Sequence, residues 1–157
     1  MNQELLNLFN KQINLEFYTS YLYYAMSTYF DKIVMQGFSM YMKHKASCEL
    51  SVAQKIYDYL ILREEKLSFL KIEGLTPHWT DISNVFSCAL EHEKMLLDEI
   101  QKLSLSAKKH YDKGAIDFIS EIYEQKNNSV KNWREIISKI QNPKIIQLEN
   151  NAVDIYI

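Results

Sequence analysis

Apolar residues recur every three or four positions along most of the chain, which is the spacing of an amphipathic helix. Four stretches show this pattern, covering about residues 3–29, 34–62, 81–110 and 115–141. A short turn near Asp31 separates the first two, and Gly114 marks the turn between the last two. Asp81 or Ser83 is the expected cap of the third stretch. The pattern therefore predicts four long helices.

Residues 63–80, with the sequence REEKLSFLKIEGLTPHWT, have no sustained period. A connection of this length is uncommon in a compact domain, but a bundle whose third helix starts at the far end requires such a crossover. The apolar residues within about 144–153 predict a short fifth helix that contacts the bundle or a neighbouring subunit. We therefore expect one all-α domain over residues 1–157, a four-helix bundle with a long crossover between its second and third helices.

Composition and charge exclude several classes of protein. The 157 residues are 47% hydrophobic and 24% charged, and the net charge of −2 offers no basic surface for nucleic acid. No apolar run reaches the ~18 residues of a membrane span, and the N-terminus starts a helix pattern rather than a signal peptide. We expect a soluble cytoplasmic protein. Cys48 and Cys88 have no pairing or zinc-binding motif, so both are expected to be reduced and buried.

Each predicted helix carries one ionisable residue in the middle of its apolar stripe, and these are Glu16, Glu49, Glu93 and Lys126. A buried lone carboxylate costs several kcal/mol or becomes neutral, so three carboxylates at one depth need a common partner. One hypothesis is a hard metal cation held by oxygen ligands from facing helices. The alternative is an internal salt-bridge cluster in which Lys126 neutralises the glutamates and no metal enters.

Other candidate side chains are a tyrosine and four histidines. Tyr23 lies on the same predicted face as Glu16, either as a core tyrosine bonded to Glu93 or water, or as an electron donor to a metal–oxygen intermediate. His92 lies about 100° around the helix from Glu93 and is expected to face solvent or a neighbouring subunit. None of the histidines completes the Glu-x-x-His pair that di-iron bundles use.

Several segments together suggest a family. Residues 14–27, NLEFYTSYLYYAMS, resemble the first-helix signature of the bacterial non-haem ferritins, and AQKIYDYL, HEK and IISKI extend the resemblance over almost the whole chain. The resemblance implies that Glu16, Glu49 and Glu93 are iron ligands and that Tyr23 lies beside them. It also implies a ferritin-like homo-oligomer of 24 subunits that stores iron, as Fe2+ and Fe3+, in a hollow cavity. Leu50 replaces the methionine of haem-binding relatives, so no haem is expected.

The sequence also departs from the family pattern. Val52 replaces a histidine ligand, Lys126 a glutamine near the metals, and Ser129 an acid. Cys48 and Gln125 fall where the family has glutamates of a third, inner iron site. A one-residue slip of the fourth helix would instead bring Gln125 and Asn128 to the ligand positions. The three glutamates thus keep most of one metal position, while the second has lost much of its ligand set.

Two functions remain open. The first is iron storage with an atypical or weakened ferroxidase, in which one iron on the three glutamates is oxidised by dioxygen or hydrogen peroxide. The second is a non-enzymatic cage whose site is filled by Lys126. A DNA-protecting mini-ferritin would need a basic tail, which the N-terminus lacks. The expected partners are therefore iron ions, an oxidant and further copies of the chain, without nucleic acid or membrane.

Overall fold

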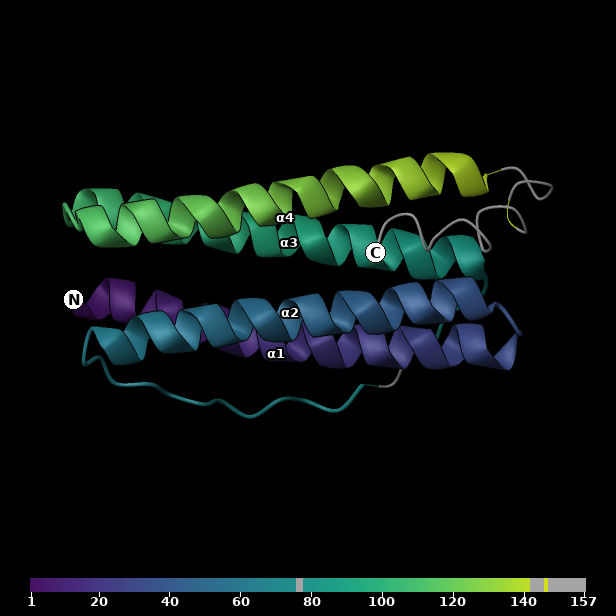
Figure 1. Cartoon of the computed structure of the whole chain (residues 1–157), viewed down its shortest axis with the longest axis horizontal. Helices are drawn as coiled ribbons and strands as arrows, with labels where there is room; N and C mark the ends of the chain where they lie inside the picture. The colour runs from purple at the N-terminus through teal and green to yellow at the C-terminus, as the bar shows by residue number, and fades with distance from the viewer. Residues whose placement is uncertain (76–77, 142–145, 147–157) are drawn as a thin grey trace.

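The computed structural model describes residues 1–75, 78–141 and 146, and these form two helical hairpins. α1 packs along α2 and α3 along α4, while α1 also packs against α3 (Figure 1). The expected all-α four-helix architecture is confirmed. The expected fifth helix lies almost entirely outside the described residues. The helices are α1 (Gln3–Lys32), α2 (Gln36–Leu62), α3 (Ile82–Lys109) and α4 (Lys113–Ile140).

Three of the helices begin at a side chain that accepts a hydrogen bond from the first helical turn. Asn2 accepts from the backbone N–H of residue 4 (2.8 Å), Asp81 from that of residue 84 (2.8 Å) and Asp112 from that of residue 115 (3.0 Å). These bonds satisfy donors that a helix N-terminus otherwise leaves free. Because Asp112 is the cap, Gly114 lies inside the first turn of α4, and its expected place in the interhelical turn is wrong.

The first three helices end with a residue in the left-handed conformation, and none of these residues is glycine. They are Val34 (φ 60°), Glu64 (φ 55°) and Tyr111 (φ 54°). In each case the next backbone N–H bonds to a carbonyl five residues earlier at 3.0 Å, a Schellman-type ending. The first turn lies at Ile33 and Val34, two to three residues after Asp31, because α1 continues to Lys32.

The buried core consists of two apolar clusters, one in each half of the bundle. One contains Phe30, Phe38 and Phe86, whose ring centroids lie 5.0–5.4 Å apart. The other contains Phe9 and Ile56 together with residues from α3 and α4. Between the clusters lies a polar layer, which is where the ionisable residue interrupts each helical stripe. The fold thus places that layer at mid-depth of the bundle.

The connection after α2 runs along α1 and is fixed by two asparagines (Figure 1). Asn10 donates to the carbonyl of Lys66 (3.1 Å) and accepts from the N–H of Ser68 (2.7 Å). Asn14, one turn later, donates to the carbonyl of Ser68 (2.8 Å) and accepts from the N–H of Leu70 (2.7 Å). Backbone groups of Lys66, Ser68 and Leu70 thus bond to side chains of α1.

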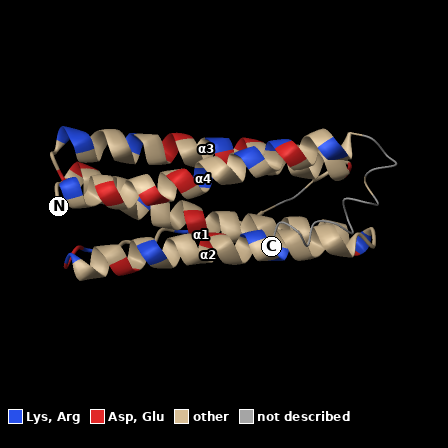
Figure 2. Ribbon diagram, turned by 45° about the horizontal axis from the view of Figure 1, so that its top comes forward, with Lys and Arg blue, Asp and Glu red and all other residues tan. Residues whose placement is uncertain are grey.

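Charged residues of both signs are spread along all four helices (Figure 2). Some of them join helices across the bundle, as Lys55 of α2 does with Glu121 of α4 (2.9 Å) and Lys11 of α1 with Glu99 of α3 (2.5 Å). Among the helices that the structure describes, none carries an apolar stretch long enough to cross a membrane.

Candidate functional site

One ionisable side chain from each helix meets in the polar layer, as the stripes predict. The exposed fractions are 0% for Glu16, 2% for Glu49, 0% for Glu93 and 1% for Lys126. Burial of this degree removes charged groups from water, so each one requires a partner inside the bundle. We call these four residues the core cluster.

Lys126 supplies the cation of the core cluster. Its Nζ donates to Glu16 Oε2 at 2.7 Å and also to Glu49 Oε2, so the ammonium group lies between carboxylates of α1 and α2. The second oxygen of Glu16 accepts a hydrogen bond from Gln12 Nε2 at 2.6 Å. A lysine at this position therefore provides the charge compensation that a metal cation would otherwise give.

The register of α4 agrees with the ungapped alignment of the sequence. Lys126 and Ser129 face the core, whereas Gln125 and Asn128 are exposed. A one-residue slip would require the opposite arrangement. Val52, where the resemblance to the family predicts a histidine, is a fully buried core side chain.

Glu93 has a separate set of partners on one of its oxygens. Oε1 accepts from the Tyr23 hydroxyl at 2.6 Å, from Ser129 Oγ at 3.1 Å and from Trp133 Nε1 at 3.4 Å. Tyr23 is thus hydrogen-bonded to Glu93, as its interpretation as a core tyrosine predicts. Among the described residues, Glu93 Oε2 has no hydrogen-bond partner.

Lys45 is a second cation at the cluster, and sequence reasoning missed it. Its Nζ lies 3.6 Å from Glu93 Oε1 and 3.9 Å from Glu49 Oε1, and it donates to Ser129 Oγ at 2.5 Å. The side chain is only 12% exposed. Its four-residue spacing from Glu49 is the signal that sequence analysis could have used, because residues i and i+4 meet on one helix face.

The protonation of the cluster follows from these neighbours. Burial raises the pKa of Glu49 well above its ordinary range, and the nearby carboxylates raise it further against the opposing effect of Lys126. Burial alone would also raise the pKa of Glu93, but Lys126, Lys45 and the hydrogen bond from Tyr23 outweigh it and hold that pKa at about 2. Burial opposes the charge of Lys126, yet the three carboxylates raise the pKa of this ammonium above its ordinary value.

Formal charges in the layer balance when Glu49 is neutral. The other two carboxylates then face the two ammonium groups of Lys126 and Lys45. The carboxyl group of Glu49 is within hydrogen-bond reach of that of Glu16, so a proton on Glu49 has an acceptor. The formal charges of the layer thus balance without a metal ion.

The core cluster as it stands does not fit a pair of metal ions. Lys126 occupies the space between two of the expected ligands, and Val52 supplies no donor atom. Among the described parts of the chain, no three His, Cys, Asp or Glu side chains converge in the geometry of a metal site. A cation would have to displace an ammonium group to bind here.

The histidines and cysteines differ from the expectations of the sequence. His92 turns toward α1, and its Nε2 lies 2.8 Å from Thr19 Oγ1. The side chain is half-buried and does not simply face solvent, because Thr19 offers a polar partner on the adjacent helix, and its contact with a neighbouring subunit stays a prediction. Cys48 is half-buried and Cys88 exposed, so their expected burial is also wrong, although both thiols are free.

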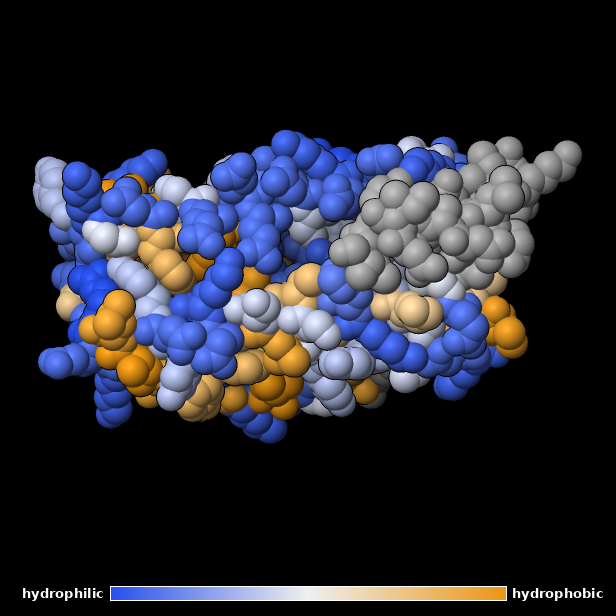
Figure 3. All heavy atoms as spheres, in the orientation of Figure 1, coloured by the Kyte–Doolittle hydropathy of each residue, from blue (hydrophilic) through white to orange (hydrophobic). Residues whose placement is uncertain are grey.

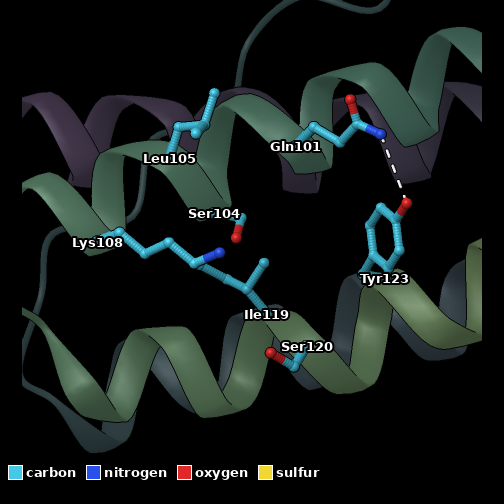
Figure 4. Close-up of a pocket in the computed structure, with 7 residues that line it drawn as sticks. All are labelled: Gln101, Ser104, Leu105, Lys108, Ile119, Ser120 and Tyr123. Atoms are coloured by element: carbon cyan, nitrogen blue, oxygen red, sulfur yellow. Dashed lines mark hydrogen bonds between the residues drawn. The ribbon is translucent and has the colours of Figure 1, made fainter.

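Two hollows on the molecule are relevant to the site. One of about 180 Å³ lies between α2 and α4 and is lined by Glu49 and Lys126 among others, so it leads to the core cluster. The other, of about 380 Å³, lies between α3 and α4 (Figure 4). It is lined by Lys108, Ile119, Tyr123 and other side chains without a carboxylate or imidazole, and Gln101 donates to the Tyr123 hydroxyl across it at 3.5 Å. The second hollow therefore offers no metal ligands.

A four-helix bundle with one long crossover, in which ionisable side chains from all four helices converge, is the ferritin-like class of bundle. The family model of the ferritin-like domain matches residues 6–142. The chain belongs to the ferritin family.

Known relatives agree with this assignment. The chain is 32% identical to a bacterial non-heme ferritin of Staphylococcus saprophyticus, over 76% of this chain and 72% of the relative. It is 28% identical to a bacterial non-heme ferritin of Bacteroides fragilis, over 90% and 89%. An open pore ferritin from Archaeoglobus fulgidus shares the fold, with a TM-score of 0.94, 24% identity and coverage of 98% of this chain and 97% of that one.

Proposed function

We propose that the protein is a subunit of a homo-oligomeric iron-storage cage whose bundle centre is an ion-pair cluster instead of a site for iron oxidation. The observation that carries the proposal is the ammonium group of Lys126, which contacts Glu16 and Glu49 inside the core. Family membership and the bacterial non-heme ferritins among its relatives support the storage role. In this function iron is the cargo of the cage and is oxidised by dissolved dioxygen or peroxide, outside the bundle.

Assembly is supported by an apolar strip on the connection after α2. Phe69 is 62% exposed, Leu70 56% and Ile72 42%, and the hydrogen bonds from Asn10 and Asn14 fix the backbone beneath them. Hydrophobic side chains gather in the lower half of the molecule in Figure 3, where α1, α2 and the connection lie. Large exposed apolar patches mark interaction surfaces. We propose that other copies of the chain cover this strip, in a cage of 24 subunits.

The second candidate function is a slow ferroxidase that uses the same residues. Two observations favour it: the hollow between α2 and α4 leads from solvent to Glu49, and Glu93 Oε2 has no partner among the described residues. In this hypothesis Lys126 withdraws toward the hollow, and one Fe2+ takes its place beside Glu16, Glu49 and Glu93. Tyr23 would then lie next to the reacting iron through its bond to Glu93.

Oxidation of Fe2+ by the assembled protein distinguishes the two functions. Fe2+ is added without oxygen, air is admitted, and ferric absorbance is followed in the wild type, Glu93→Gln and Glu99→Gln. Glu99 is the matched control because it is an acid on the same helix that pairs with Lys11 and Lys102 outside the core cluster. An ion-pair cluster predicts equal rates in all three proteins, no faster than in buffer. Fast oxidation that Glu93→Gln alone abolishes would overturn the proposal in favour of the ferroxidase.

The assembly itself is measured separately. Sedimentation of the wild type is expected to give a large closed particle, and Phe69→Asp is expected to release smaller species because it places a charge in the apolar strip. A wild-type protein that remains monomeric would contradict the cage, whatever the oxidation rates show.

A further inference from the structure

His44 and Cys48 lie one turn apart on the same face of α2, and their side chains touch. His44 Nε2 is 3.4 Å from Cys48 Sγ. Both residues are half-buried and line the 180 Å³ hollow between α2 and α4, opposite the amide side chains of Gln125 and Asn128. An imidazole and a thiol are thus presented together at an opening to solvent.

The separation of these two atoms suits one particular coordination geometry. With bond lengths of about 2.3 Å to sulfur and about 2.05 Å to nitrogen, a separation of 3.4 Å corresponds to an angle at the metal of roughly 100°. This angle is close to that of a tetrahedral zinc site. A linear two-coordinate ion would hold the same atoms about 4.3 Å apart, the sum of those bond lengths.

We propose that His44 and Cys48 form a chelating site for a tetrahedral cation of the zinc class, at the mouth of this hollow. The ion replaces the proton of the Cys48 thiol, which passes to water, and bonds to the thiolate sulfur and to the neutral imidazole Nε2. Among the described residues no third His, Cys, Asp or Glu completes the set, so water fills the remaining positions or an amide oxygen of Gln125 or Asn128 does. The inference does not depend on the proposed storage function.

The charges around the hollow favour a thiolate-seeking ion over a hard one. Lys45 and Lys126 line the same hollow and outnumber its one carboxyl group, that of Glu49, so they repel a cation that is held by charge alone. Thiolate and imidazole ligands select zinc-class ions, whereas hard ions prefer carboxylate and water. The same environment therefore discriminates against Mg2+ and Mn2+.

Cys88 and His92 on α3 provide a comparison within the chain. They have the same four-residue spacing with cysteine and histidine in the reverse order, but the imidazole of His92 is 2.8 Å from Thr19 Oγ1 and packs near the ring of Tyr18. Cys88 is exposed on its own helix. Cys88→Ser is therefore the matched control for Cys48→Ser.

The test is a titration of the assembled protein with Cd2+, whose bond to thiolate gives an ultraviolet charge-transfer band that carboxylate binding does not produce. We expect one band-forming Cd2+ per subunit in the wild type and in Cys88→Ser, and no such band in Cys48→Ser. His44→Ala is expected to weaken Cd2+ binding by at least about tenfold. Loss of a residue that only supports a metal ligand already lowers metal affinity by about tenfold or more. Zn2+ should displace the Cd2+, and Mn2+ should not.

Two results would overturn the site. One is a wild-type protein that shows no thiolate band at one Cd2+ per subunit. The other is a band that survives in Cys48→Ser and disappears in Cys88→Ser. Circular dichroism and sedimentation of each variant verify that the half-buried Cys48→Ser exchange, which replaces sulfur by oxygen, leaves fold and assembly intact.

Discussion

Lys126 Nζ and Glu16 Oε2 lie 2.7 Å apart in the middle of the core, although 110 positions separate the two residues in the chain. The bond joins α4 to α1 across the bundle, and the same ammonium also reaches Glu49 on α2. A buried ion pair adds little net stability over an apolar core, but removal of one member leaves a buried charge without compensation. The stability of this protein should therefore depend on each member of the cluster in a different way.

Lys126→Gln is expected to lower the free energy of unfolding by about 3–5 kcal/mol, because the buried carboxylate of Glu16 loses its cation. A divalent cation can then take over the compensation, so Mn2+ should raise the melting temperature of the variant and leave the wild type unchanged. Lys55→Gln is the control, since its exposed pair with Glu121 contributes about 0–1 kcal/mol. Equal melting temperatures of Lys126→Gln and the wild type would contradict the role of the cluster.

Glu49→Gln and Glu93→Gln should differ strongly at pH 7. Glu49 carries a pKa raised by burial, so a neutral amide of the same shape replaces it at little cost, below about 1 kcal/mol. Glu93 is ionised and accepts hydrogen bonds from Tyr23 and Ser129. Glu93→Gln is therefore expected to lower the free energy of unfolding by about 3 kcal/mol, as the depressed pKa of Glu93 implies. Chemical denaturation of the two variants measures this difference. Similar losses in both would show that Glu49 is charged in the folded protein.

The depressed pKa of Glu93 also predicts loss of stability in acid. The folded value is about 2 and the ordinary value 4.5, so this contribution is present above pH 4.5 and disappears as the pH falls toward 2. Glu93→Gln lacks the titrating group. The difference in unfolding free energy between wild type and variant should therefore shrink by about 3 kcal/mol between pH 5 and pH 2. A difference that stays constant over this range would contradict the assigned pKa.

The sequence was sufficient for the helices and for the core cluster, because both depend on a local period. Glu16, Glu49, Glu93 and Lys126 stand out as the ionisable members of otherwise apolar stripes, and a stripe fixes which side chains face inward. The partners of these residues were harder to predict. Lys45 lies beside the apolar stripe of its helix, so a search of inward-facing positions passes over it, although it precedes Glu49 by four residues.

The long connection after α2 was predicted, but the bonds that fix it and the positions of two turns were not, for a related reason. The bonds of Asn10 and Asn14 join residues more than fifty positions apart, and nothing in the local sequence of residues 66–70 indicates them. The turns were predicted near Asp31 and at Gly114, but the chain reverses at Val34 and Tyr111. Valine and tyrosine are unusual in the left-handed region. Side chains of this type give no turn signal.

Asn14→Ala should loosen the connection without unfolding the bundle. The asparagine satisfies the carbonyl of Ser68 and the N–H of Leu70, and loss of both bonds costs about 1–3 kcal/mol. Limited proteolysis is expected to cut residues 66–75 faster in the variant than in the wild type. Asn7→Ala is the control on the same helix, since Asn7 is exposed and accepts its bond from Gln3. Unchanged cleavage in Asn14→Ala would show that other contacts hold the connection.

Val34→Gly is expected to stabilise the protein. Val34 is β-branched and has φ 60°, and the left-handed region costs a residue with a side chain roughly 1–2 kcal/mol that glycine avoids. Its side chain is 76% exposed, so little packing is lost on removal. Glycine also gains more freedom in the unfolded chain, which leaves a net increase of about 0.5–1 kcal/mol in the free energy of unfolding. Ile33→Gly, one position earlier in the same turn at φ −98°, lacks the strain and should destabilise instead. If thermal denaturation shows both variants below the wild type, the left-handed residue is not strained or its side chain is needed in the assembled protein.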